Sequence, residues 1–281
     1  MQRALLVLLL ALLVGATACG GAGKSVSSAT TAAAREGSAQ QAVLAAASKA
    51  GALKSGRVSF TAKLTGGVTG GTFTGEGVFA DKRARMSMDM SGLAGGGLGG
   101  GQMEMVFENL VLYMKFPPAL ARELPAGKTW IKFDLAELGK AQGIDFAALF
   151  DQASGSDPTK TLQFLRAAQD DFRRVGTEEV RGVETTHYSG TVDLAVLAEK
   201  SPPAVRESYR RAIELSGQSR VPVEVWLDDQ GRTRRMRYEQ KMAGGSTMEL
   251  TQEYFDFGTD VEVTPPPARE VIDVTQLIAN A

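Results

Sequence analysis

Cysteine, histidine and long apolar runs are scarce in this chain, and each scarcity excludes a class of protein. One cysteine in 281 residues rules out a disulfide framework, and one histidine leaves no pair of ligands for a histidine and cysteine metal site. The net charge is −1, so there is no basic excess to contact nucleic acid. After the first 14 residues no apolar run approaches the length of a membrane span. We therefore expect no nucleic-acid partner, no metal and no cofactor.

Catalytic arrangements are missing as well. The single histidine, His187, stands in TTHYSG within a predicted strand, where a structural or exposed imidazole is the simplest interpretation. No serine occupies the strained turn between strand and helix that hydrolases use for their nucleophile. Neighbouring acidic residues such as Glu178 and Glu179 are expected at the solvated surface. The sequence predicts that the protein is not an enzyme and has no catalytic residues.

The first 18 residues have the features of an export signal. Arg3 precedes an unbroken apolar stretch over residues 4–14, and small residues follow at 15–18. In a helix this stretch would cover about 16 Å, roughly half of a bilayer's hydrocarbon core, which is too short for a span. Cys19 comes next, and a lone thiol in an oxidising compartment needs a partner in another chain or a different chemistry.

Two fates fit Cys19. The stretch ATACG at 16–20 resembles the lipobox of bacterial lipoproteins, in which the cysteine takes a diacylglycerol on sulfur and the preceding peptide is removed. The alternative is ordinary secretory cleavage, which would leave a free thiol. We favour lipidation, with acyl chains such as palmitate anchoring the protein to the outer face of the cell membrane, because two or three chains hold a protein there stably. Residues 1–18 are then a lipoprotein signal peptide, and the small, polar residues 19–38 are a flexible tether.

The remaining residues, 39–281, are expected to form a single α+β domain. Apolar residues recur with a period of two in eleven segments separated by glycine, proline or short polar turns. Those segments are 57–65, 71–80, 83–90, 102–108, 111–116, 129–135, 172–180, 183–192, 221–229, 233–242 and 246–257. The first six follow one another too closely for crossover helices, so we expect an antiparallel sheet.

Four or five helices accompany these strands. Helical periodicity indicates helices over 40–50, 144–150, 158–169, 193–200 and 202–216. In the first of them Val43 and Leu44 share the apolar face, and the last is expected to begin after a capping Ser201 and to end at Gly217.

Three features together resemble a known family: the lipobox with its tether, GKTWIKFDLAEL at 127–138, and RGVETTHYSGTVDL at 181–194 followed by VPVEVWLDDQGRTRRMRYEQ at 221–240. They are similar to the LppX and LprG group of actinobacterial envelope lipoproteins, within the LolA-like superfamily. The resemblance implies an antiparallel half-barrel of about eleven strands wrapped around the helices. It also implies an apolar cavity that holds acyl chains, and no catalytic residues.

A methionine stripe is the most distinctive pattern in the domain. Three methionines alternate on one predicted strand and two on the next, so a hairpin can place both sets side by side on one face. Two interpretations stay open, plain core packing and the lining of an acyl-chain cavity, which a flexible thioether would suit. The predicted cavity-lining residues are Met86, Met88, Met90, Met103, Met105, Leu112, Met114, Val223, Val225, Met236 and Tyr238. Arg235 and Arg237 alternate with Met236 and Tyr238 and therefore belong to the opposite face, where they either solubilise the protein or dock it to an anionic bilayer.

The leading hypothesis is therefore an extracytoplasmic lipoprotein, anchored through Cys19, that binds or transports a lipid or a lipidated molecule. The alternative is a structural or regulatory lipoprotein that binds an envelope protein partner without a lipid ligand. Importer binding proteins fit poorly, because they need alternating strands and helices in two lobes.

Overall fold

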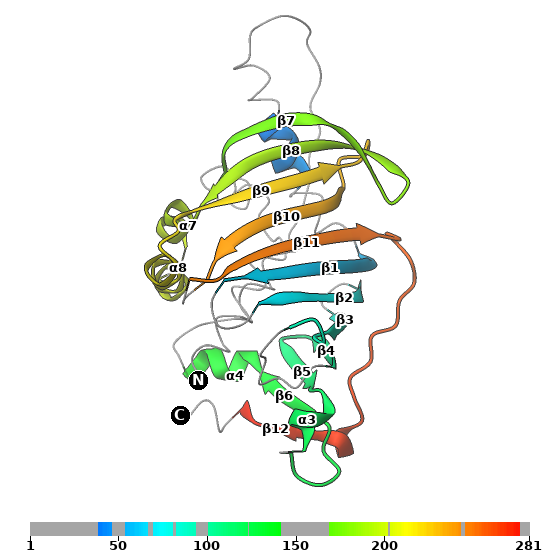
Figure 1. The fold of residues 1–281 in the computed structure, drawn as a ribbon. Helices are drawn as coiled ribbons and strands as arrows, with labels where there is room; N and C mark the ends of the chain where they lie inside the picture. Colours follow the sequence, from blue (N-terminus) through cyan, green and yellow to red (C-terminus); the bar gives the residue numbers. More distant parts are fainter. Residues whose placement is uncertain are drawn as a thin grey trace, which may run out of the picture.

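One twelve-stranded sheet organises the computed structural model (Figure 1). The structure describes residues 39–46, 54–66, 70–80, 83–93, 101–122, 124–141, 169–201, 203–242 and 245–275. The strand order is β12-β6-β5-β4-β3-β2-β1-β11-β10-β9-β8-β7, and the sheet is strongly twisted and open, with β12 at one edge and β7 at the other. The predicted signal peptide, the predicted tether and Cys19 lie outside the described residues.

The strands are β1 Ser55–Thr65, β2 Gly71–Ala80, β3 Arg83–Asp89, β4 Gln102–Glu108, β5 Val111–Lys115, β6 Trp130–Asp134, β7 Gln169–Val180, β8 Val183–Asp193, β9 Arg220–Leu227, β10 Thr233–Lys241, β11 Thr247–Phe255 and β12 Val271–Asp273. The helices with named bounds are α3 Pro118–Ala121, α4 Leu135–Ala141, α7 Leu194–Lys200 and α8 Pro203–Ser216, with a short 3-10 helix at Ala268–Glu270. Residues 39–46 are helical as well.

The predicted α+β class and antiparallel sheet are confirmed, and each of the eleven predicted strands is present within a few residues of its expected bounds. Neighbours pair as antiparallel strands, and Gly231 turns β9 into β10 with a φ of 71° that suits glycine. The exception is β12, which pairs in parallel with β6 and was not predicted. Strand β12 has only three residues, which are too few for an alternating pattern to be recognised in the sequence.

The helical predictions held in part. Residues 39–46 are helical, with Val43 and Leu44 buried, and Gly217 ends α8 with a φ of 65°. The prediction for Ser201 is wrong: its hydroxyl donates to the carbonyl of Leu197 at 2.7 Å and ends α7 instead. Asp193 caps the start of α7 by accepting from two backbone N–H groups. Helices α7 and α8 lie together at the left edge of the sheet in Figure 1.

The central segment departs from the expected pattern. Residue 169 is the first of β7 rather than the last of a helix, whereas 144–150 and 158–168 lie outside the described residues. Helix α4 was not predicted, because the alternation of β6 runs directly into it. Asp134 caps α4 by accepting from the N–H of Glu137 at 3.1 Å.

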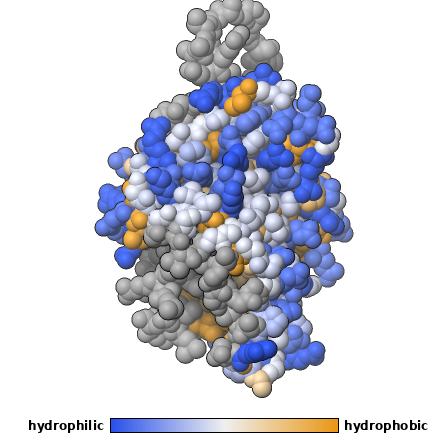
Figure 2. All heavy atoms as spheres, in the orientation of Figure 1, coloured by the Kyte–Doolittle hydropathy of each residue, from blue (hydrophilic) through white to orange (hydrophobic). Residues whose placement is uncertain are grey.

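Alternation gives the sheet two chemically different faces. We call the side that carries Phe60, Met88 and Leu250 the inner face, and the side that carries Thr61 and Thr251 the outer face. On the inner face the helix of residues 39–46 packs against Phe172, Val225 and Leu227, among others. On the outer face Val263, from the segment after β11, is buried against Val106 and Trp130. Elsewhere the surface in the view of Figure 2 is predominantly hydrophilic, with apolar residues scattered over it.

Candidate functional site

The methionines of β3, β4 and β5 meet on the inner face. Met86 pairs with Met105 and Met88 with Met103 across β3 and β4, and Met105 pairs in turn with Met114 of β5. Because the side-chain period of a strand is two, one register brings all of these thioethers to the same side. They form two adjacent cross-strand rows of unbranched, polarizable side chains, one that runs from Met86 through Met105 to Met114 and one that joins Met88 to Met103.

These methionines are buried to different degrees. Met88, Met90 and Met114 are buried, with Met88 only 2% exposed, whereas Met86, Met103 and Met105 are half-buried. Met88 and Met90 belong to a core cluster with Phe60, Ala62 and Leu250, and Met86, Met103, Met105 and Tyr238 pack against it. Leu112 is buried on the same face beside Met114.

The remaining predicted lining residues lie farther along the same face. Val225 pairs with Met236 and Val223 with Tyr238 across β9 and β10. Val223, Val225 and Met236 belong to the cluster under the helix of residues 39–46. Nine of the eleven predicted residues thus fall into two apolar clusters, and Tyr238 packs against the one that contains the methionines of β3. Leu112 and Met114 are buried beside them on β5.

A glycine on β2, Gly75, leaves room for the ring of Phe60 at the centre of the inner face. Gly75 of β2 stands between Phe60 and Met88 in the register. A Cβ atom placed on it would lie 2.4 Å from Cε1 of Phe60, so the ring covers the glycine and only glycine fits there. Phe60 also meets Phe73 edge to face at 6.1 Å.

Three polar residues interrupt the apolar face on β10 and β11. Gln252 is 8% exposed and pairs in the register with Met236 on one side and Phe60 on the other. The hydroxyl of Tyr254 donates to Oε1 of Gln252 at 3.4 Å. Burial raises the pKa of Tyr238 to about 12 and also raises the pKa of Tyr254, so both phenols stay protonated at neutral pH. Sequence reasoning missed Gln252, although a lone amide in the alternating run MELTQEY is a visible signal.

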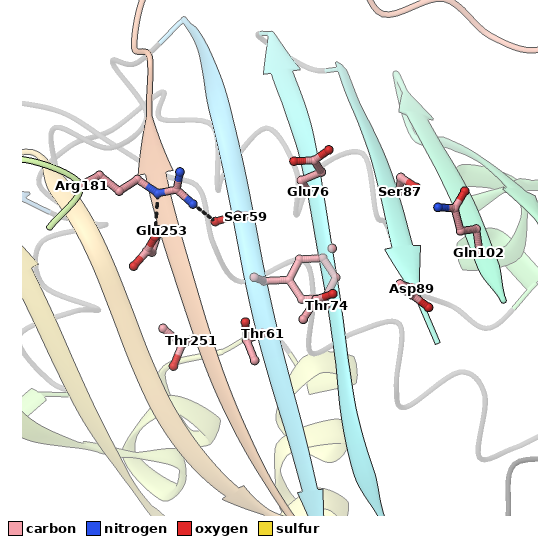
Figure 3. A pocket seen from close by; sticks show the side chains of 12 residues that line it. Ser59, Thr61, Thr74, Glu76, Ser87, Asp89, Gln102, Arg181, Thr251 and Glu253 are labelled. Atoms are coloured by element: carbon pink, nitrogen blue, oxygen red, sulfur yellow. Dashed lines mark hydrogen bonds and ion pairs between the residues drawn. The ribbon is translucent and has the colours of Figure 1, made fainter. Parts of the chain in front are cut away.

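The outer face carries two polar hollows that adjoin at Thr251 and Glu253. One, of about 480 Å³, is lined largely by hydroxyl and carboxylate side chains of β1 to β4 and β11 (Figure 3). At its edge Arg181, from the turn between β7 and β8, donates to Glu253 and to the hydroxyl of Ser59. The other, of about 510 Å³, is lined by residues of β7 to β11.

The second hollow contains His187, which stacks on Trp226 with ring centroids 4.1 Å apart. Nε1 of Trp226 donates to Glu178 at 2.7 Å, and Arg235 donates to Glu178 and to Glu253. Burial opposes ionisation of Glu253, but hydrogen bonds from Arg235 and Arg181 outweigh it and hold its pKa below the usual value. The two arginines predicted on the outer face, Arg235 and Arg237, are therefore paired with carboxylates. The ion pairs of Glu178 with Arg235 and of Arg181 with Glu253 link the β7–β8 hairpin to β10 and β11.

Within the described ranges, no three histidine, cysteine or acidic side chains gather as potential metal ligands. The same part of the chain contains no helix of sufficient length and apolarity to cross a bilayer. Of the two faces, the apolar inner one has the chemistry to receive a large apolar ligand.

Comparison with known proteins found a matching family model and curated relatives. A family model described as LppX_LprAFG lipoprotein matches residues 124–263, which run from just before β6 past β11. A Streptomyces griseus protein, described as an uncharacterized 31.2 kDa protein in the rplA–rplJ intergenic region, is 35% identical over 158 residues. That alignment covers 54% of this chain and 50% of the relative.

A Streptomyces coelicolor protein named as a candidate lipoprotein is 33% identical over 165 residues, which are 56% of this chain and 47% of the relative. The chain thus spans about half the length of the curated relatives it matches. Among solved structures, LprF from Mycobacterium bovis is similar over 82% of this chain and 97% of its own, at 16% identity and a TM-score of 0.46.

Proposed function

The chain belongs to the LppX_LprAFG lipoprotein family, and we propose that it is an envelope lipoprotein that binds or carries a lipid or lipidated molecule on the inner face of its sheet. The observation that carries the proposal is the continuous apolar row across β3, β4 and β5, flanked by the cluster of β1 and β11. An acyl chain is an extended apolar ligand, and a row of paired side chains along neighbouring strands offers it an extended apolar surface.

The methionines on the inner face favour a ligand whose acyl chains vary in length or shape. Methionine has three rotatable bonds and no branch, so a row of methionines can repack around chains of different length or curvature. The half-buried members, Met86, Met103 and Met105, are the ones still free to gain contacts. Each methylene group of an acyl chain that moves from water to such a surface contributes about 0.8 kcal/mol, so a long chain is held firmly without any polar contact.

The proposal includes an anchor at Cys19. The lipobox-like stretch and the family of lipoproteins both favour a diacylated amino terminus, held on the outer face of the cell membrane by its acyl chains. The tether over residues 19–38 would let the domain move above that membrane, as a carrier between two lipid surfaces requires.

Native mass spectrometry of the full chain, expressed in an actinobacterial host and purified from membranes, tests this function. The denatured mass reports the covalent acyl groups, so any further mass in the native spectrum is non-covalent ligand. We expect lipid-sized additional mass that organic extraction removes and that reappears after incubation with a lipid extract.

A folded protein whose native and denatured masses agree, and which takes up no lipid on incubation, would contradict lipid binding. That result would favour the alternative of a lipoprotein that binds a protein partner.

A further inference from the structure

The polar residues on the inner face are not explained by holding an acyl chain. Gln252 is more than nine-tenths buried, yet the residues paired with it are Phe60 and Met236. The row continues through Gly75 to Met88 on one side and to Val225 on the other, and none of these residues is charged or polar. A glutamine here occupies a position where the pattern calls for methionine or leucine.

The hydrogen bonds of this amide are incomplete among the described residues. Its Oε1 accepts from the Tyr254 hydroxyl, which orients the amide, and its Nε2 meets no acceptor there. The hydroxyl of Tyr238, on the neighbouring strand and the same face, likewise has no hydrogen-bond partner in the described part of the chain. Two donors without a protein acceptor in the described part of the chain are therefore presented to the inner face, where a ligand oxygen can pair with them.

The surroundings limit what the missing acceptor can be. A phosphate or carboxylate would need a cation beside it, and the residues nearest Gln252 in its row, Phe60 and Gly75 on one side and Met236 and Val225 on the other, are uncharged. A carbonyl oxygen is neutral, has two lone pairs and can accept from both donors at once. In an acyl lipid that group is the ester carbonyl, which adjoins the apolar chain.

We infer that Gln252 and Tyr238 form a hydrogen-bonding subsite for the ester carbonyl of an acyl lipid, with Tyr254 as the residue that positions the amide. The inference rests on the proposed function, since it locates a polar part of the ligand within the same face. It makes the protein selective for ester lipids over alkyl ethers of equal length, because an ether leaves both donors without a carbonyl to bind.

The test compares two probes, dioleoylglycerol and its dialkyl ether analogue, which differ only in the two carbonyls. Binding of each from detergent solution is measured on the purified full chain and on Gln252→Met, which keeps the length of the side chain and removes its polarity. We expect wild type to prefer the ester about tenfold, and Gln252→Met to reduce that preference to within about twofold without weakening ether binding. Gln102→Met, the same change on the exposed outer face, should leave the ratio unchanged.

Two further variants keep the inference testable if Gln252→Met does not fold. Tyr238→Phe and Tyr254→Phe each remove one oxygen, and each should lower the ester-to-ether ratio; a purely structural role for Tyr254 would change stability and leave the ratio alone. Wild-type protein that binds both probes equally would overturn the subsite and leave lipid binding standing. Protein that binds neither probe would overturn both.

Discussion

Replacing a methionine by glutamine at two neighbouring positions of the inner face should give opposite results. Met88 and Met105 both lie on the inner face in neighbouring strands, but Met88 is 2% exposed and Met105 is half-buried. Glutamine has nearly the same length as methionine, so the substitution changes polarity far more than volume. The position therefore decides whether the cost appears in folding or in binding.

At Met88 the amide would have no hydrogen-bond partner, because its paired neighbours are Gly75 and Met103. The lost burial of an apolar side chain and the unsatisfied polar group each cost about 1–3 kcal/mol, and we expect about 3 kcal/mol together. For a domain of this size that lowers the melting temperature by about 6–12 °C. Lipid bound per folded molecule should change little.

At Met105 the amide can reach solvent in the free protein, so we expect less than about 1 kcal/mol of destabilisation. With lipid bound the same amide would be desolvated against the acyl chain, and lipid capture should fall about tenfold. Differential scanning fluorimetry and bound lipid per folded molecule are measured for both variants, with Ser87→Gln on the outer face as the control. If Met105→Gln lowers the melting temperature as much as Met88→Gln and leaves lipid binding unchanged, the row is ordinary core.

Three further predictions concern other regions of the chain. Cys19→Ser should move the protein from the membrane to the soluble fraction and remove the covalent acyl mass; identical fractionation of both forms would refute the anchor. The carboxylate of Asp228 is fully buried between Arg232 and Arg234, and although burial opposes ionisation, hydrogen bonds from both arginines hold its pKa below the usual value. The Asp228 carboxylate therefore stabilises the fold above about pH 4, and this contribution is lost as pH falls through the folded pKa. Asp228→Asn should lower the free energy of unfolding by about 3 kcal/mol at pH 7. In urea titrations, the free energy of unfolding of the variant should fall less on acidification than that of the wild type. His187→Ala removes the stack on Trp226 and should cost about 1 kcal/mol in thermal unfolding without changing lipid capture; a specific loss of binding in folded protein would show that the imidazole has a functional role.

Local chemistry determined much of what could be predicted. The alternation in segments such as 57–65 and 233–242 reflects a sheet with one apolar face, and this pattern depends only on neighbours in sequence. The side-by-side placement of Met88 and Met103 follows from the same period once the two strands pair as a hairpin. Gly217 follows the last turn of α8, and Gly231 lies in the turn between β9 and β10. The backbone has a positive φ at both positions, which favours glycine.

Other features had a weak local signal or none. Helix α4 was marked by Asp134 and Glu137 at capping distance, but the strand pattern before it obscured the boundary. Nothing in the sequence near β12 indicates that it will pair with β6, because the two strands are far apart in the chain. The ion pair between Lys132 and Asp273, for example, joins residues 141 positions apart. The cluster of Glu178, Trp226 and Arg235 likewise forms only when the β7–β8 hairpin curls over the sheet.

The sequence by itself determined the elements, the division of the sheet into an apolar and a polar face, and the absence of obvious catalytic or metal-binding motifs, because each of these depends on residue type and period. Only the tertiary structure decided the strand order, the graded burial along the methionine row and the isolation of Gln252 among apolar neighbours. These depend on which distant strands become neighbours: β11 joins β1 across almost 200 residues, and that pairing places a single amide beside Phe60.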